Sequence, residues 1–146
     1  MLYLWHILAY PIYQILSTIR HELSHAVAYW LSGWRVTEIK VLPSKVDGRF
    51  YWGYIRVEPK NHYNLNIHMA LAPHYVNLIS ITAWLSWYLN DYPWIRSDAT
   101  HTWIIITVLG LISPAVDFGY GLLKSIITNH GDFASALKIW RINKEK

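Results

Sequence analysis

The residues of this chain best suited to chemistry are the five from 21 to 25, which read His-Glu-Leu-Ser-His. Residues four apart lie on one face of a helix, so the imidazoles of His21 and His25 can share one metal ion. Imidazole is a common zinc ligand, and Glu22 between them would lie near the ion as a general base. The spacing therefore predicts hydrolytic chemistry at one Zn²⁺ ion per chain, provided that a helix carries these residues.

A second interpretation of this segment is structural: both histidines would be hydrogen-bonded side chains at helical spacing, with no metal. The position of the neighbouring charged residues favours the metal-binding interpretation. Arg20 and Glu22 lie within an apolar stretch that runs from Leu2 to about Leu31. Ionisable residues at membrane depth are costly, and they usually mark a functional site.

The composition indicates a small membrane protein. The chain has 146 residues, of which 53% are hydrophobic and 15% are charged, against about 25% charged in soluble domains. Its 9 Trp and 11 Tyr suit membrane–water interfaces. Cysteine is absent, so a metal would be held by His, Asp or Glu. We therefore expect one membrane-embedded domain over residues 1–146.

Three apolar segments exceed the ~20 residues that a bilayer requires, at about 2–32, 65–89 and 103–127. The first ends at a Ser-Gly helix stop. The second contains Pro73 and the third contains Pro114. Because proline lacks an N–H, each should free backbone groups that need partners in a cavity. The predicted fold class is a mainly α integral membrane protein with three transmembrane helices.

The segment between the first two spans has a different period. Residues 36–41 alternate as a strand does, and residues 50–57 are rich in aromatic and β-branched side chains. Turn residues lie between these two segments, at 43–44 and 47–48. A small β-hairpin or sheet is therefore expected over about residues 34–58.

The C-terminal segment predicts a short amphipathic helix. Residues 129–132 break the chain and offer an N-cap, after which Phe133, Leu137 and Trp140 recur at helical spacing among basic residues. Such a helix would lie on an anionic membrane leaflet, although a solvated tail fits the same composition.

The basic residues predict an orientation. The loop after the first span holds six and the C-terminal tail holds four, whereas the loop between the second and third spans holds only Arg96, against Asp91 and Asp98. By the positive-inside rule, the hairpin and C-terminus are cytoplasmic and the N-terminus is outside. We expect a multi-pass protein of a prokaryotic cytoplasmic membrane. The charges form no stripe that would bind nucleic acid.

The depth of residues in the predicted membrane spans identifies further candidate residues for the metal site. Counting 1.5 Å per residue, Asp117 in the third span and His74 and Asn77 in the second lie within about 10 Å of the depth of His21 and His25. Asp117 is the preferred third zinc ligand, with a structural partnership to a helix N–H or to a lysine as the alternative. His74 could be a ligand, a hydrogen-bonding residue or a donor to substrate.

The motifs resemble those of the site-2 proteases, a family of intramembrane zinc metalloproteases. Residues 21–27 and 31–36 resemble the first core helix of that family and the strand entry after it. Residues 113–119 resemble its proline-containing segment, whose Asp is the third zinc ligand. Residues 72–77 resemble its Gly-Pro-x-x-Asn motif, with one extra residue before Asn77. Ser113 and Phe118 depart from the usual residues, and the chain has no room for a PDZ-type domain.

The resemblance implies an intramembrane zinc metalloendopeptidase. It would hydrolyse peptide bonds of transmembrane or membrane-proximal segments by zinc-activated water, with metal ligands His21, His25 and Asp117. Glu22 would be the general base, and Asn77 or His74 would help to stabilise the oxyanion.

The expected partners are a transmembrane protein or peptide and the lipid bilayer, with no nucleic acid. An edge of the hairpin could hold unwound substrate by β-augmentation. The alternative is a related membrane protein that binds metal without catalysis, or one that serves only interactions. A soluble peptidase is disfavoured because the chain is too short to bury three apolar segments. The oligomeric state stays open.

Overall fold

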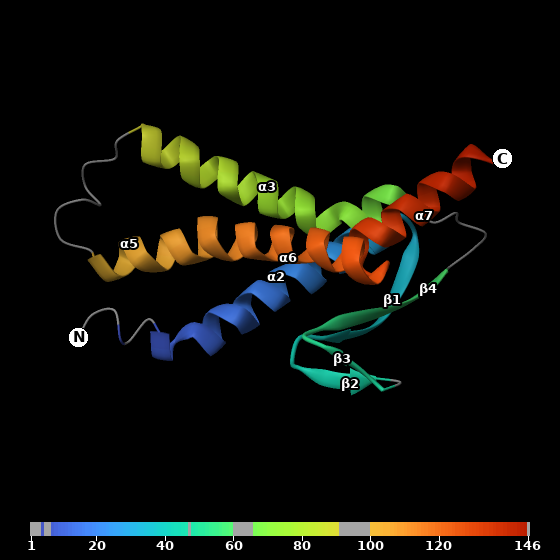
Figure 1. The fold of residues 1–146 in the computed structure, drawn as a ribbon, viewed down its shortest axis with the longest axis horizontal. Coiled ribbons are helices and arrows are strands. Elements are labelled where there is room, and N and C mark those ends of the chain that lie inside the picture. The colour runs from blue at the N-terminus through green and yellow to red at the C-terminus, as the bar shows by residue number, and fades with distance from the viewer. Residues whose placement is uncertain (1–3, 5–6, 47, 60–65, 91–99, 146) are drawn as a thin grey trace.

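Three long helical segments form the body of the molecule in the computed structural model, which describes residues 4, 7–46, 48–59, 66–90 and 100–145 (Figure 1). The segments lie near the three predicted spans. Their bounds are α2 (Tyr10–Leu31), α3 (Ile67–Leu89), and a run of α5 (Thr100–Thr107), the π-helix η1 (Val108–Ile112) and α6 (Ser113–Thr128). The predicted stop after the first helix is confirmed, because Ser32 caps α2 and Gly33 has φ 80°.

One helix of the described residues, Thr102–Thr128, is long and apolar enough by composition to cross a membrane. Only 6% of its most apolar window is buried inside the protein, so its surface is largely free to face another medium. This helix corresponds to the third predicted span. The shorter helices α2 and α3 carry more polar residues, including the histidines of the predicted site.

The predicted hairpin is confirmed as two consecutive antiparallel strand pairs. β1 (Trp34–Lys40) pairs with β4 (Tyr54–Pro59), and β2 (Ser44–Val46) pairs with β3 (Arg49–Tyr51) beyond them. β1 and β4 lie against α2. The approach is closest at Gly53, where an added Cβ would lie 2.6 Å from Thr18 Cγ2 and 2.9 Å from Glu22 Cγ. Glycine is therefore needed at this contact between hairpin and helix.

The C-terminal helix is confirmed as α7 (Asp132–Lys144). It packs on α3 through Ala136 and Ile139, which form a buried cluster with Ala70. Leu137 and Trp140, two of the apolar residues that predicted an amphipathic helix on a membrane leaflet, are 44% and 51% exposed, and the placement on a leaflet stays a prediction. Small alanine side chains allow the two helices to approach closely.

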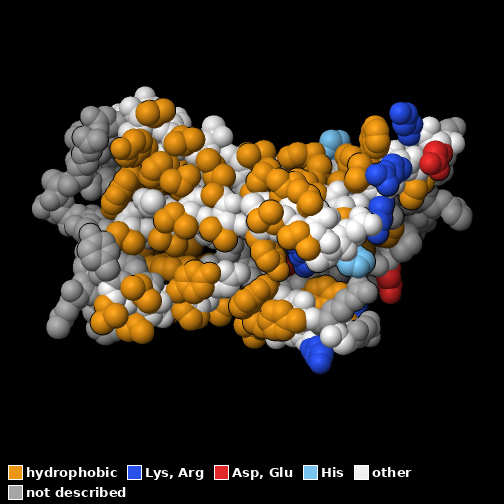
Figure 2. Space-filling view, viewed as in Figure 1, with side chains coloured by type: hydrophobic (Ala, Val, Ile, Leu, Met, Phe, Trp, Pro, Cys, Tyr) orange, Lys and Arg blue, Asp and Glu red, His pale blue; other side chains and the backbone are white. Residues whose placement is uncertain are grey.

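Polar side chains lie inside the helical body and large apolar side chains lie outside it. The buried polar residues are Ser17, Thr18, Glu22, His25, His74, Asn77 and Ser125. Exposed apolar residues occur on every long helix and include Ile12, Leu16, Leu23, Val27, Leu78, Ile79, Leu85, Val116, Leu123, Ile126 and Ile127. Figure 2 shows this apolar covering along the helices, with Lys and Arg gathered toward the end that holds the hairpin and α7.

Candidate metal centre

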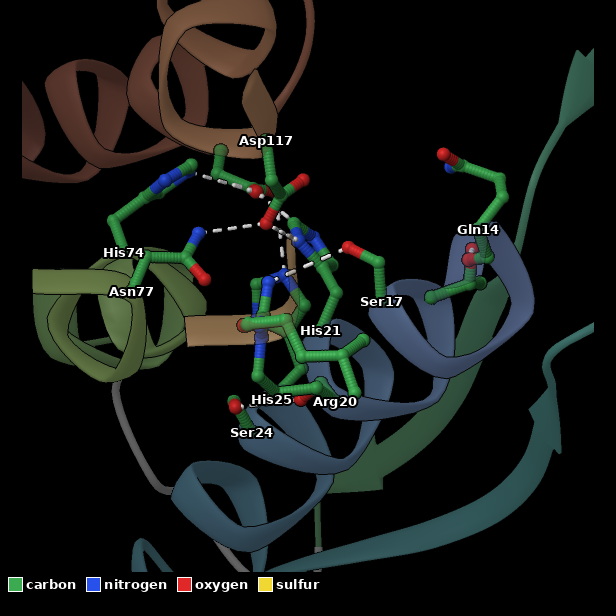
Figure 3. Close-up of polar contacts among 12 residues, drawn as sticks. Gln14, Ser17, Arg20, His21, Ser24, His25, His74, Asn77 and Asp117 are labelled. Atoms are coloured by element: carbon green, nitrogen blue, oxygen red, sulfur yellow. Dashed lines mark hydrogen bonds and ion pairs between the residues drawn. The ribbon is translucent and has the colours of Figure 1, made fainter. Parts of the chain in front are cut away.

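The structure brings the predicted site residues of three helices together (Figure 3). His21 and His25 come from α2, His74 and Asn77 from α3, and Asp117 from α6. Nδ1 of His21 lies 3.0 Å from Oδ2 of Asp117. The amide of Asn77 donates to the same oxygen at 2.7 Å. The convergence expected from depth is therefore observed, and the catalytic and ligand roles of these residues stay predictions.

A second aspartate, which the sequence interpretation assigned only to a helix start, also enters this site. Oδ2 of Asp132 lies 3.2 Å from Nε2 of His21, and its Oδ1 lies 3.3 Å from Nε2 of His25. Donor atoms of these three residues lie within 4.8 Å of one another, a spacing that could hold a metal ion. Two imidazoles and a carboxylate form a donor set that Zn²⁺ accepts, so the residues present fit this metal.

The sharp break between α6 and α7 delivers Asp132 to the histidines. Asn129 ends α6 in the left-handed region at φ 53°, and Gly131 precedes α7 at φ 104°. The N-cap is Gly131, within the segment that was predicted to offer one, and it makes no side-chain cap hydrogen bond. Asp132 instead lies just inside the helix and directs its carboxylate at the site. The feature of the sequence that could have indicated this role of Asp132 is the presence of an acidic residue soon after the third predicted span.

The ring of His25 is fixed by a backbone carbonyl that a proline leaves free. Nδ1 of His25 lies 2.9 Å from the carbonyl oxygen of Met69. In a regular helix this oxygen would accept from the N–H of residue 73, but Pro73 has none. α3 nevertheless continues through Pro73 without a break. The freed backbone group expected at this proline is thus observed, with an imidazole as its partner.

A similar contact joins Arg20 to the third helical segment. Nη1 of Arg20 donates to the carbonyl oxygen of Leu109 at 3.1 Å, within the π-helix η1. There the N–H of Ser113 reaches the carbonyl of Val108, five residues back. With the same five-residue spacing, the carbonyl of Leu109 would accept from the N–H of residue 114. Residue 114 is a proline and has no N–H. The guanidinium satisfies the carbonyl that would otherwise be left without a donor.

His74 supports the carboxylate of Asp132 from the side of α3. Its side chain is 2% exposed, and its Nε2 lies 3.2 Å from Oδ2 of Asp132. The ring stacks on Phe133 at a centroid distance of 4.2 Å. An added Cβ at Gly121 of α6 would come within 2.8 Å of Cε1 of His74. The imidazole is therefore held tightly between α6 and α7.

Glu22 lies beside these histidines in the sequence but on the side of α2 that the hairpin covers. The residue is buried, with 7% of its surface exposed, and Gly53 is its close neighbour. Access of substrate to Glu22 would thus involve the hairpin.

The carboxylate of Asp132 has three imidazole neighbours, His21, His25 and His74. Burial raises the pKa of Asp132, but hydrogen bonds to His21, His25 and His74 outweigh that effect and hold the pKa well below its ordinary value. The carboxylate is therefore ionised at neutral pH, which is the form that binds a metal ion.

Comparison with known proteins gives a match to a family model over part of the chain. A family model described as Peptidase M50B-like, of the site-2 protease family, matches residues 1–47, about a third of the sequence. The matched segment includes the HELSH residues and β1. M50 peptidases are in general zinc-dependent and membrane-embedded. No curated protein and no solved structure matched the chain.

Proposed function

We propose that this chain is an intramembrane zinc metalloendopeptidase that cleaves peptide bonds of transmembrane or membrane-proximal segments. One observation carries the proposal: both HELSH imidazoles turn Nε2 toward one carboxylate in a polar interior, within a helical body whose exterior is apolar. The Peptidase M50B-like match over the same helix supports it.

The proposed location is a membrane that all three long helical segments cross. Their exposed apolar side chains support this arrangement, because contiguous apolar surface of this kind is rarely left in water. In Figure 1 the start of α2, the end of α3 and the start of α5 lie at one end, with the hairpin and α7 at the other. The basic residues gather at that second end, which we assign to the cytoplasm.

The proposed reaction is hydrolysis of an amide bond. When bound, Zn²⁺ supplies Lewis-acid chemistry that makes water nucleophilic and polarises a peptide carbonyl. The carboxylate of Glu22 takes a proton from the attacking water and gives it to the leaving amine as the C–N bond breaks. His21, His25 and a carboxylate would hold the metal, and the site offers Asp117 and Asp132 for that third position. Asn77 and His74 are then positioning residues for these carboxylates.

The hairpin is the proposed place for substrate. A transmembrane helix hides its amide bonds, so a substrate must unwind before attack. The β1–β4 pair lies against α2 next to Glu22, and an unwound segment could add to one of its edges as a further strand.

The test is cleavage of a transmembrane peptide by the detergent-purified chain, together with its zinc content. We expect Glu22→Gln to keep zinc and to lose at least about 100-fold in cleavage rate, because general-base catalysis contributes that much. Glu145→Gln, at an exposed residue just after α7, is the matched control and should keep both.

Two results would contradict the proposal. Wild-type protein that contains no zinc, and whose folding ignores chelators, would exclude a zinc peptidase. Wild-type protein that binds zinc but cleaves none of the tested peptides would instead favour the second candidate function, a non-catalytic metal-binding membrane protein. The compact donor set of His21, His25 and Asp132 is the observation that would support that candidate.

A further inference from the structure

The two nitrogens of His21 face two different carboxylates. Nδ1 lies 3.0 Å from Asp117 and Nε2 lies 3.2 Å from Asp132. A metal-bound histidine uses one ring nitrogen for the metal and donates the N–H of the other to an outer partner, often a carboxylate or a backbone carbonyl. Only one of the two aspartates can therefore share the metal with His21.

His25 decides which nitrogen faces the metal. Its Nδ1 lies 2.9 Å from the carbonyl of Met69, and a carbonyl oxygen can only accept a hydrogen bond. Nδ1 of His25 therefore carries the hydrogen, which leaves Nε2 for the metal. That Nε2 lies 3.3 Å from Oδ1 of Asp132. A metal ion bound by both histidines would therefore lie on the Nε2 side, where Asp132 is.

The spacing of these atoms suits a single small cation. In a tetrahedral zinc site with bonds of about 2.0–2.1 Å, neighbouring donor atoms are about 3.3 Å apart. The distance from Oδ2 of Asp132 to Nε2 of His21, 3.2 Å, and the distance from its Oδ1 to Nε2 of His25, 3.3 Å, are both close to this length.

We propose that Asp132 is the third protein ligand of the metal and that Asp117 is a positioning residue that holds the ring of His21 from outside the coordination sphere. This assignment rests on the proposed zinc-dependent function and replaces Asp117 as the expected third ligand. Asn77 donates to Asp117 and fixes it in turn. His74 lies 3.2 Å from the oxygen of Asp132 that faces His21 and so orients the ligand. α7 then completes the metal site.

The test uses the absence of cysteine from the chain, which makes any introduced thiol the only one. Asp132→Cys and Asp117→Cys are each purified as full-length protein and loaded with Co²⁺. A thiolate bound to Co²⁺ gives a near-ultraviolet charge-transfer band, whereas a thiol outside the coordination sphere gives none. We expect the band in the Asp132→Cys protein and not in the Asp117→Cys protein. A band from Asp117→Cys, alone or with the other, would overturn the assignment.

Zinc affinity of two isosteric variants tests the assignment if a cysteine variant does not fold. Asp117→Asn should weaken zinc binding by about 10–100-fold, as loss of an outer partner does, and Asp132→Asn should weaken it by more. The reverse order would overturn the assignment. Wild-type protein that binds neither Zn²⁺ nor Co²⁺ would instead refute the proposed function, so the two failures are distinguishable.

Discussion

Two prolines in neighbouring helical segments create the same local defect and serve different purposes. Pro73 in α3 frees the carbonyl of Met69, and Pro114 at the start of α6 leaves the carbonyl of Leu109 without its π-helical donor. A side chain of α2 binds each carbonyl: His25 binds the first and Arg20 binds the second. Both contacts join α2 to the rest of the bundle.

The difference between them lies in what the carbonyl controls. At Met69 it fixes the tautomer and the ring orientation of a HELSH histidine, so the defect in α3 positions the proposed metal site. At Leu109 it holds a guanidinium that also donates to Ser17 at 3.3 Å within α2, so the defect serves packing. Proline thus supplies an acceptor, and the α2 residue that meets it decides whether the contact bears on chemistry.

Replacing each proline by alanine would test this difference and should give the largest effect. In Pro73→Ala a new N–H competes for the Met69 carbonyl, and His25 loses its exclusive acceptor. We expect zinc affinity to fall by about 10–100-fold, because outer partners contribute that much. α3 itself should be no less stable, since alanine is the better helix former. Chelator competition measures the affinity, and circular dichroism measures the helix.

Pro114→Ala is the matched variant. It should give a donor to the Leu109 carbonyl and displace Arg20, with zinc affinity unchanged within about twofold, as expected for a separate site. Equal losses of zinc affinity in both proline variants would contradict the division between a site contact and a packing contact.

Much of the site could be predicted from the sequence because helices fix depth. HELSH, Asp117 and the Pro73 segment lie at similar heights in three predicted spans, and the regular rise of a helix converts that into proximity. His21 and Asp117 are 96 residues apart in sequence and in direct contact. The hairpin was predictable for a similar reason, since its alternation and turn residues are local signals.

Asp132 could not be predicted as part of the site because its position depends on backbone angles. The sequence marks a break at residues 129–132 but not the direction that the chain takes after it. The left-handed Asn129 and the positive φ of Gly131 set that direction. An aspartate in a first helical turn also has an ordinary explanation in the helix dipole. The sequence interpretation assigned no face of α7 to packing on α3, and two of its three buried hydrophobic residues are small alanines rather than strongly apolar residues.

Arg20→Met sharpens the comparison at the packing contact, with a smaller expected effect. Methionine keeps the length of the side chain but leaves the Leu109 carbonyl without its donor. Loss of a hydrogen bond from a charged donor costs about 1.5–3 kcal/mol, so thermal unfolding of the detergent-solubilised protein should begin at lower temperature. Zinc content should stay at the wild-type level. Loss of zinc together with stability would show that Arg20 supports the metal site after all.

Two glycines of α6 provide the finest test, because they differ in what lies beside them. An added Cβ at Gly121 would lie 2.8 Å from Cε1 and 3.3 Å from Nε2 of His74, whereas one at Gly119 meets nothing within 4 Å. His74 is buried against Phe133, so the ring can yield only by shifting its bond to Asp132. Gly121→Ala should therefore weaken zinc binding by less than about tenfold, since an outer contact is displaced rather than removed. Gly119→Ala should leave zinc affinity unchanged and stabilise the helix by up to about 1 kcal/mol.

Because both changes add the same methyl group to one helix, a difference in zinc affinity isolates the contact with His74. Equal affinities would mean that His74 does not position Asp132, and the influence of α3 on the metal would then pass through the Met69 carbonyl and through Asn77, which donates to Asp117.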